Sequence, residues 1–360
     1  MKQALNDTDP QQEAADAEDM PDVSIKEVAR LAGVSIATVS RCINKPEKVT
    51  PKTRIKVQDA ISQTGYSPNT LAQSFRRGRT NIVMVVLPSV GDPFFTAVIS
   101  GIRGVARVKG YSVLIEEAEL HKKTADEIGA MLVSNQTDGI ILLASMSPFG
   151  NEVLSANSKR RLPIIIGFET VSSDLAGFPS VHIDNIAAAK EATNYLISQG
   201  HQRIAMVCGH ESSLLTNDRE LGYRAAMKQA ELSIEDGWVV AGDLTLAGAR
   251  KATRNLLNHG NRPTAIFCAN DEMAIGSFHE IKSAGLQVPR DISIVGFDDI
   301  RYAEVTDPPL TTIRQPAKEI GERVMYQLCR CIEAGKGASS EPEIVPHELV
   351  IRQSVAKPAS

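Results

Sequence analysis

Polar and aromatic side chains follow three apolar runs of this 360-residue sequence, and each run reads as a buried strand. The runs are 82–87, 264–268 and 292–297, and the residues after them are Asp92, Phe94, Phe95, Asn270, Asp271, Asp298 and Asp299. In doubly wound α/β sheets, ligands bind in the crevice beyond the carboxyl ends of the strands. We therefore expect a small-molecule site there.

Asp298 and Asp299 form the carboxylate pair that suggests acid–base catalysis, but adjacent residues on an extended segment point apart. The sequence has no phosphate-binding G-x-x-x-x-G-K-[ST] loop, no G-x-G-x-x-G and no G-x-S-x-G. His182, His201 and His210 lack metal-ligand spacing. We expect no enzyme, no cofactor and no metal, and we keep an α/β enzyme acting on a sugar or nucleoside as an alternative.

A second group of residues, 24–44, has the pattern of a helix-turn-helix. Ser24 with Glu27 predicts a capping box, Gly33 the end of a first helix, and Ser35 the cap of a second. The outward face of the second helix is what a DNA major groove would meet. The side chains expected to point outward or sideways are Ile36, Ala37, Ser40, Arg41 and Asn44. A solvated helical hairpin is the alternative.

The net charge of −4 conceals a partition along the chain. Residues 23–80 carry eleven Lys or Arg and three Asp or Glu, whereas residues 1–22 carry seven acidic residues and one Lys. Positive charge concentrated on the helix pair suits a surface that meets phosphates. The acidic segment 1–22 has few apolar residues, and we expect a disordered leader.

A third helix is predicted from Thr50-Pro51 to about Gly65. Ile55, Val57 and Ile61 are expected to form the apolar stripe of this helix, and the expected core of the domain is Val28, Leu31, Val39, Ile43, Val57, Ile61 and Tyr66. Beyond Pro68, eight residues could form a short basic helix with Phe75 as an apolar tip. Such a helix would fold only on DNA, with Phe75 wedged into the minor groove, or the segment is a plain linker.

From residue 81 strands and helices alternate, which predicts two doubly wound α/β lobes. The expected strands are 82–87, 111–115, 139–143, 203–207, 238–241, 264–268 and 292–297, and the expected helices are 94–109, 123–135, 186–199, 217–230, 247–258 and 272–284. Asp271 is expected to cap the helix 272–284. Five scattered cysteines predict reduced thiols, and no apolar run is long enough to span a membrane.

Ordered motifs extend along the chain. Residues 25–44 read I-K-E-V-A-x-x-A-G-V-S-x-x-T-V-S-R-x-x-N, followed by G-Y-x-P-N at 65–69, D-P-F-F at 92–95, V-x-I-D-N at 181–185, G-H-x-R-I at 200–204, D-R-x-x-G-Y at 218–223, F-C-A-N-D at 267–271, G-F-D-D at 296–299 and P-P-L-T-T-I-x-Q at 308–315. Over about residues 23–353 they resemble the lactose/galactose-repressor (LacI/GalR) family. Residues 92–115 are similar to its cytidine-repressor branch.

The resemblance implies a helix-turn-helix head at 23–68, a hinge helix or linker at 69–80, and a periplasmic-binding-protein-like core at 81–353. Its N-lobe would comprise about 81–183 and 314–338, and its C-lobe about 184–313 and 343–353. Ile36, Ala37 and Arg41 match base-reading positions, and Ser35, Thr38, Ser40 and Asn44 lie beside them to cap the helix or hold the backbone. Phe75 stands where the family usually has an intercalating Leu, which is a departure.

The resemblance also implies an effector site for a sugar or nucleoside. The matching positions are Asp92, Phe94, Phe95, Arg219, Asn270, Asp298 and Gln315. Aromatic faces would stack on a ring, and the polar groups would bond its hydroxyls. Phe94 or Phe95 could instead belong to the core. Leu244 stands where relatives often carry a second stacking aromatic, which disfavours a sandwiched purine.

We therefore expect a repressor that binds pseudo-palindromic double-stranded operator DNA as a homodimer, with allosteric control by the effector. We expect it in the cytoplasm, associated with the nucleoid and not with a membrane. A solute-binding protein is a further alternative, but the basic head and the missing signal peptide disfavour it. The sequence does not identify the effector, or whether the effector releases or promotes DNA binding.

Overall fold

The structure is a computed structural model that describes residues 24–66, 79–117, 136–143, 162–168, 177–210, 213–334 and 341–358. The expected leader at 1–22, most of the hinge with Phe75, and the helix expected at 123–135 lie outside these residues. The chain divides into two compact units, Met1–Gly78 and Arg79–Ser360. Each unit is described by itself.

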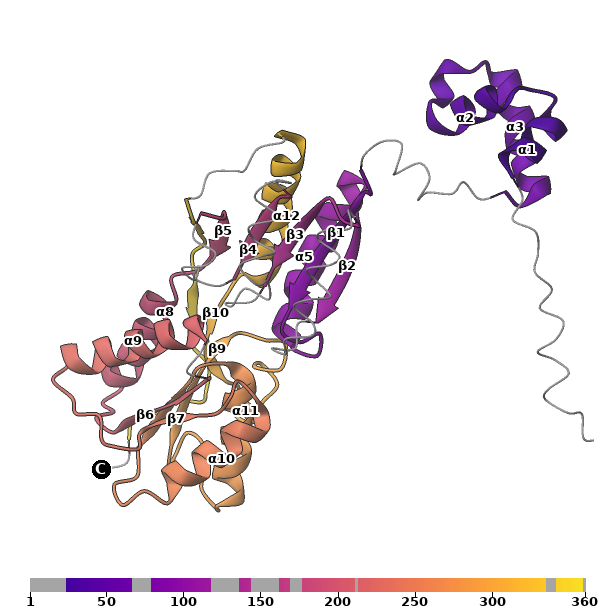
Figure 1. Cartoon of the computed structure of the whole chain (residues 1–360). Coiled ribbons are helices and arrows are strands. Elements are labelled where there is room, and N and C mark those ends of the chain that lie inside the picture. Colours follow the sequence, from indigo (N-terminus) through magenta and orange to yellow (C-terminus); the bar gives the residue numbers. More distant parts are fainter. Residues whose placement is uncertain are drawn as a thin grey trace, which may run out of the picture. The chain divides into compact units, whose positions relative to one another are not determined.

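Short helices make up the first unit (Figure 1). They are α1 (Ile25–Ala32), α2 (Ile36–Asn44), the 3-10 turn η1 (Pro46–Lys48) and α3 (Pro51–Thr64). Gly33 ends α1 at a φ of 64°, in the left-handed region that glycine adopts at low cost. The hydroxyl of Ser35 accepts from the Thr38 N–H and so begins α2, and Thr50 begins α3 in the same way. The expected helix-turn-helix is confirmed.

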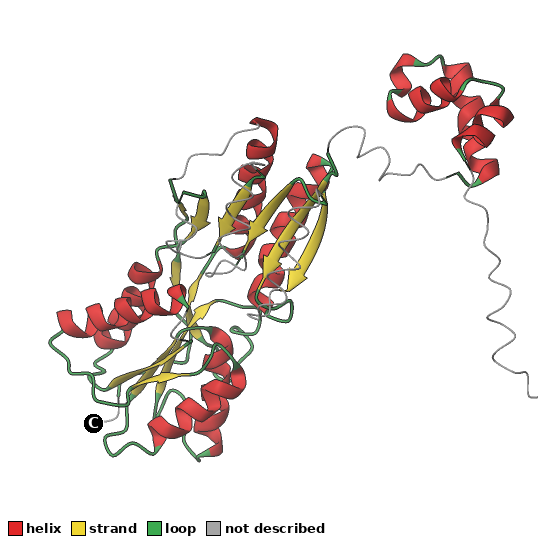
Figure 2. Cartoon of the chain, in the orientation of Figure 1, coloured by secondary structure: helices red, strands yellow, loops and turns green. Residues whose placement is uncertain are grey.

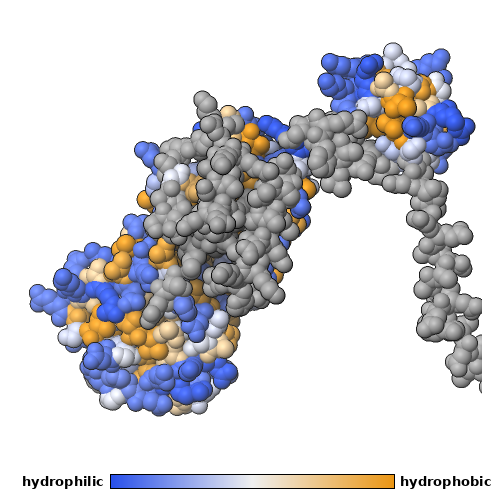
Figure 3. Space-filling model, viewed as in Figure 1, coloured by the Kyte–Doolittle hydropathy of each residue, from blue (hydrophilic) through white to orange (hydrophobic). Residues whose placement is uncertain are grey.

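The core of the first unit differs in part from the expected one, although the expected Ile43, Ile61 and Tyr66 do pack against it, partly buried. The buried side chains are Val28, Ala29, Ala32, Val39, Cys42, Val57 and Ala60. The prediction that Leu31 lies in the core is wrong, since its side chain is 45% exposed, and Ile55 of the expected apolar stripe is 58% exposed. Ala29 and Ala32 of α1 and Ala60 of α3 are buried in the core instead, and their small side chains let the helices approach closely. Figure 3 accordingly shows apolar residues among hydrophilic ones on the surface of this unit.

The expected capping box at Ser24 is also wrong. The Ser24 side chain makes no capping hydrogen bond. Glu27 instead pairs with the guanidinium of Arg30, whose Nε donates to Oε2 at 3.1 Å. A charged partner one turn away provides a stronger bond than the N-terminal amide would.

Two sheets form the second unit. The first has the strand order β2 (Ser112–Glu117), β1 (Ile82–Leu87), β3 (Gly139–Leu142), β4 (Ile164–Gly167), β5 (Ser180–His182), β11 (Glu343–Ile344). The second has the order β7 (Val239–Ala241), β6 (Ile204–Cys208), β8 (Ala265–Cys268), β9 (Ser293–Asp298), β10 (Thr311–Arg314), β12 (Glu348–Val350). Both repeat one doubly wound topology, and the described pairings are parallel except β10 with β12. The expected fold class is confirmed.

Helices cover the sheets (Figure 2). In the first lobe α5 (Pro93–Lys109) packs on α12 (Ala317–Ala334). Gly101 and Gly321 allow this contact, because a Cβ on either would stand 2.1 Å from a carbonyl oxygen of the other helix. In the second lobe α8 (Asn185–Ser198) packs with α9 (Leu214–Gln229), and α10 (Leu246–Leu257) with α11 (Asp271–Ser283). The two pairs cover opposite faces of the second sheet.

Three described segments cross between the lobes, after β5, after β10 and after β11. The last crossing lies later in the chain than the expected lobe boundary at residue 343. Glu343 and Ile344 pair with Val181 and His182 in the first sheet, so the chain changes lobe after β11. A two-residue strand carries too weak a sequence signal to show this pairing.

The C-terminal segment is held against the second lobe by His201, which is 2% exposed. Its Nε2 donates to the Ala356 carbonyl at 2.9 Å, and its Nδ1 accepts from the Thr264 hydroxyl at the same distance. Burial lowers the pKa of His201, while the bond to Ala356 opposes this effect. The imidazole is therefore neutral in the folded protein.

We expect His201→Gln to lower the stability of the protein at neutral pH. We expect this loss of stability to become smaller as the pH falls. The unfolded chain takes up a proton on His201 below pH ~6.5, and the folded chain resists this uptake, so the contribution of His201 to stability falls as the pH falls. Thermal unfolding at pH 7.5 and 5.5 checks this: the gap in Tm between wild type and variant should narrow at pH 5.5. A gap that widens on acidification would contradict a neutral His201.

Candidate functional site

The first candidate site is the exposed face of α2. Ser35, Ile36, Ala37 and Arg41 are exposed, and Thr38, Ser40 and Asn44 are half-buried beside them. The Ser35 hydroxyl lies 2.9 Å from that of Thr38. These bonds hold the amino end of the helix in shape. Their contacts with DNA remain a prediction, as does the role of Phe75.

Arg41 is the residue of this face best suited to read a base. Its guanidinium has no hydrogen-bond or ion-pair partner among the described residues. Asn44, by contrast, donates from Nδ2 to the Ser40 carbonyl at 2.8 Å. An unengaged fork of donors matches the two acceptors of a guanine edge in the major groove.

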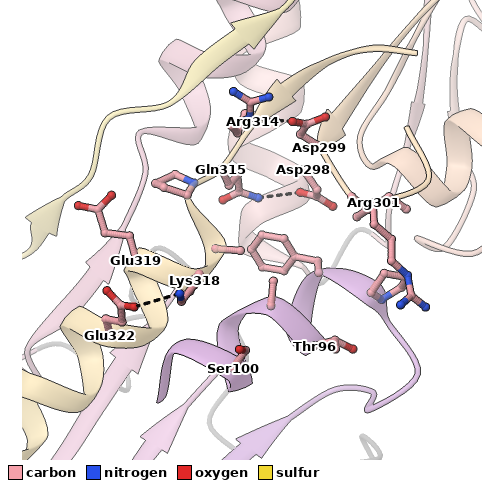
Figure 4. A pocket seen from close by; sticks show the side chains of 16 residues that line it. Thr96, Ser100, Asp298, Asp299, Arg301, Arg314, Gln315, Lys318, Glu319 and Glu322 are labelled. Carbon is pink, nitrogen blue, oxygen red and sulfur yellow. Dashed lines mark hydrogen bonds and ion pairs between the residues drawn. The ribbon is translucent and has the colours of Figure 1, made fainter. Parts of the chain in front are cut away.

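The second candidate site is a cleft of about 640 Å³ between the two lobes of the second unit (Figure 4). Residues from the amino ends of α5 and α12 line one side. The turn after β9 and the end of β10 line the other. Phe94, Asp298 and Gln315 of the expected effector set lie in its wall.

Arg219, Asp298 and Gln315 form one buried polar group. Arg219, on α9, is 1% exposed, and its Nη2 lies 3.6 Å from Oδ1 of Asp298. Gln315 donates from Nε2 to the same carboxylate oxygen at 2.7 Å. The Arg219 guanidinium also stacks 3.6 Å above the ring centroid of Phe297 and donates from Nε to Asn185 at 3.0 Å. The fold thus brings three expected residues together from separate elements.

One polar atom of this group and one of the adjoining Asn185 have no hydrogen-bond partner among the described residues. They are Oε1 of Gln315 and Nδ2 of Asn185, whose side chains are 3% and 2% exposed. One is an acceptor and the other a donor. A buried polar atom without a partner is costly, and a ligand hydroxyl in the cleft would satisfy Oε1 of Gln315, which lies in the cleft wall.

The cleft carries an excess of carboxyl groups. Burial raises the pKa of Asp298 to about 7; the positive charge of Arg219 opposes this rise, and the negative charge of Asp92 adds to it. Burial also raises the pKa of Asp92, and burial together with Asp92 raises that of Glu272. Arg219 is the cation beside these buried carboxyl groups, whereas the wall of the cleft also carries Arg301, Arg314 and Lys318 with Asp299, Glu319 and Glu322. The charges around Asp298 therefore favour a neutral hydroxyl over an anionic group at that buried end of the cleft.

Three phenylalanines pack together beside this group. The ring centroids of Phe94 and Phe168 are 4.7 Å apart, and Phe95 lies 5.4 Å from Phe168. All three are buried, so Phe94 and Phe95 belong to the core, while Phe94 also lines the cleft. The sequence analysis missed Phe168. Its position directly after an apolar run, at residues 163–167, was the signal that would have found it.

The roles of Asn270 and Asp271 differ from expectation. Asn270, and not Asp271, caps α11, because its Oδ1 accepts from the Met273 N–H at 2.8 Å. Its Nδ2 donates to the Leu244 carbonyl at 3.1 Å. Both ends of Asn270 are engaged within the protein, and its effector contact stays a prediction. Asp92 likewise caps α5 through the Phe94 N–H at 2.8 Å.

Other chemistries have no support in the described residues. They contain no cluster of three or more His, Cys, Asp or Glu that could hold a metal ion. The five cysteines are buried and unlinked. No helix in the described part of the chain is both long and apolar enough to cross a membrane.

Two family models match the chain. Residues 24–69 match bacterial regulatory proteins of the lacI family, and residues 193–355 match a periplasmic binding protein-like domain. The chain is 37% identical to the HTH-type transcriptional repressor CytR of Escherichia coli (strain K12) over 331 residues, which cover 92% of this chain and 96% of that protein. It is also 37% identical to the ribose operon repressor of the same strain, covering 83% and 90% of the two chains.

A solved structure supports the same assignment. The lac repressor dimer bound to operator and the anti-inducer ONPF superposes with a TM-score of 0.82 at 27% identity, covering 93% of this chain and 99% of that chain. These relatives are transcription repressors and not enzymes. The match includes both the DNA-binding head and the two-lobed core. The chain belongs to the lacI family of bacterial DNA-binding transcription regulators.

Proposed function

We propose that this regulator represses transcription as a homodimer on a pseudo-palindromic operator, and that a neutral sugar or nucleoside bound between its lobes sets its operator affinity. The observation that carries the proposal is the buried contact of Asp298 with both Arg219 and Gln315 beside the inter-lobe cleft. The relatives CytR and the ribose operon repressor support the same class of function.

On the DNA side, Ile36, Ala37 and Arg41 read base edges. Ser35, Thr38, Ser40 and Asn44 hold the helix and the DNA backbone, and Phe75 inserts at the operator centre. Ile36 and Ala37 offer only apolar contacts, such as with thymine methyl groups. Arg41 therefore carries most of the hydrogen-bonding specificity of each head, and a two-fold dimer doubles its contribution.

On the effector side, Arg219, Asp298, Gln315 and Asn270 bond ligand hydroxyls, and Asp92 faces them from the first lobe. Phe94 and Phe95, with Phe168 behind them, supply the apolar wall. Because these groups come from both lobes, a ligand that contacts both favours a closed arrangement of the core. Differential binding to two arrangements is what allosteric control of the head requires.

Exposed apolar side chains of the second lobe suit a dimer contact. Leu246, Tyr302 and Val305 are 45%, 42% and 72% exposed. The lac repressor is a dimer on its operator. A DNA-bound regulator of this kind acts in the cytoplasm at the nucleoid.

We expect neutral ligands to stabilise the protein and their phosphorylated forms to do so much less. A thermal-shift series would compare D-ribose, cytidine and adenosine with ribose 5-phosphate and the two nucleoside 5′-monophosphates. A ligand at 100 times its Kd adds ~2.7 kcal/mol to the free energy of unfolding, which raises Tm by several degrees. Equal stabilisation by the phosphates would contradict the electrostatic argument.

A further inference from the structure

We infer that Asp271 and Thr312 are positioning residues of the effector site: their side chains hold the turn that presents Asp298 to the ligand. The inference rests on the proposed function of the cleft. Neither residue belongs to the effector-contacting set. Both act through the backbone that carries that set.

The Asp271 carboxylate joins three elements of the second lobe. Asp271 is the first residue of α11 and has no exposed surface. Its Oδ2 accepts from the Ile300 N–H at 2.9 Å, in the turn after β9, and its Oδ1 accepts from the Thr312 hydroxyl at 2.6 Å, in β10. Gly296 in β9 makes room, because a Cβ there would stand 2.2 Å from that Oδ1.

The turn held in this way has a strained backbone. Asp298 has a φ of 110° and Asp299 a φ of 54°, both in the left-handed region that residues with a Cβ avoid. Such a conformation persists only when the surroundings enforce it. Asp271 enforces it from the helix side through Ile300.

Ion pairs hold the other side of the turn. Asp299 pairs with Arg314 and Arg352, each at 2.7 Å. The Asp298 side chain is thereby left to Arg219 and to Gln315, and Gln315 lines the cleft together with Asp298. Asp298 and Asp299 point to different partners as the sequence suggested, and the strained backbone between them is what separates the two.

A second loop of this lobe depends on the neighbouring residue, Asn270. Asn270 donates to the carbonyl of Leu244, which has a φ of 58°. The dipeptide Asn270-Asp271 at the start of α11 therefore supports two strained loops. The N-cap bond of Asn270 orients the pair.

The test compares two hydroxyl deletions in the same lobe. Thr312→Val removes the bond to Asp271, and Thr253→Val removes an equally buried bond, 2.8 Å long, from Thr253 to the Ser277 hydroxyl between α10 and α11. Calorimetric titration with cytidine, adenosine and D-ribose should show about tenfold weaker binding for Thr312→Val, wild-type affinity for Thr253→Val, and recovery in Thr312→Ser. Operator affinity without ligand should not change.

A ligand-independent readout accompanies the titration. Hydrogen exchange of the Ile300 amide should accelerate about tenfold in Thr312→Val and in Asp271→Asn, but not in Thr253→Val. Unchanged exchange in Thr312→Val would overturn the inference even if none of the three ligands binds.

Different results would contradict the effector site in the cleft and the positioning role of Asp271 and Thr312. If Arg219→Ala abolishes binding while Thr312→Val and Thr253→Val behave alike, the cleft is the effector site and the positioning role is wrong. If Arg219→Ala binds the ligands as wild type does, the proposed site itself is wrong.

Discussion

Replacing Arg41 by alanine is expected to lower operator affinity by about 2–6 kcal/mol for the two heads of a dimer, roughly 30-fold to 20,000-fold in Kd. The side chain is exposed and has no partner among the described residues, so the loss of the side chain and of its charge should leave Tm unchanged. Effector binding should stay as in wild type. Fluorescence anisotropy with operator and with mutated duplexes gives the measurement.

Lys56→Ala is the matched control for Arg41. Lys56 is an exposed cation of the same unit on α3, outside the recognition face. Its loss should weaken binding to all duplexes alike and flatten the slope of log K against log salt by about one at most. If Arg41→Ala also weakens all duplexes equally, Arg41 contacts phosphates and the base-reading assignment fails.

Asp298→Asn is expected to abolish stabilisation by the effector and to change how stability depends on pH. The pKa of Asp298 is about 7 in the folded protein, against an ordinary value near 3.8. Between these values the folded chain holds a proton that the unfolded chain has released, so Asp298 lowers the stability of the wild type as the pH rises. The asparagine variant lacks this loss. Thermal unfolding from pH 4 to 8 should show the wild type falling relative to the variant.

Asp291→Asn is the control for the pH series. A hydrogen bond from Arg290 lowers the pKa of Asp291, a carboxyl of the same lobe. Its contribution is complete above its unfolded value, so the difference in Tm between wild type and Asp291→Asn should stay constant from pH 5 to 8. Effector stabilisation should be retained. A constant difference for Asp298→Asn as well would show that Asp298 is ionised throughout.

The local signals of the head were readable because capping and periodicity depend on neighbours in sequence. Gly33, Ser35 and Thr50 mark helix ends through their own backbone or side chain. The apolar periodicity was misleading for Leu31 and Ile55, whose side chains are exposed. An amphipathic stripe shows which side of a helix is apolar, but the packing partner decides which part of that stripe is covered.

The adjacent pair Asn270-Asp271 shows the limit of reading single residues. Either type can cap a helix, and the sequence favoured Asp271. Asn270 takes the cap because its own backbone is extended, with a φ of −150° and a ψ of 170°, while Asp271 already lies in the helix. A difference of one residue exchanges the roles of the two side chains.

The sequence by itself determined that the chain has a basic helix-turn-helix followed by two α/β lobes, because strand and helix periods, glycine positions and charge are local properties. It also placed polar residues at the ends of the strands. Only the tertiary structure decided that Arg219, Asp298 and Gln315 meet, that Phe168 joins Phe94, and that β11 pairs with β5. Those contacts join residues far apart in the chain, and their geometry follows from how the sheets and helices pack and not from any single segment.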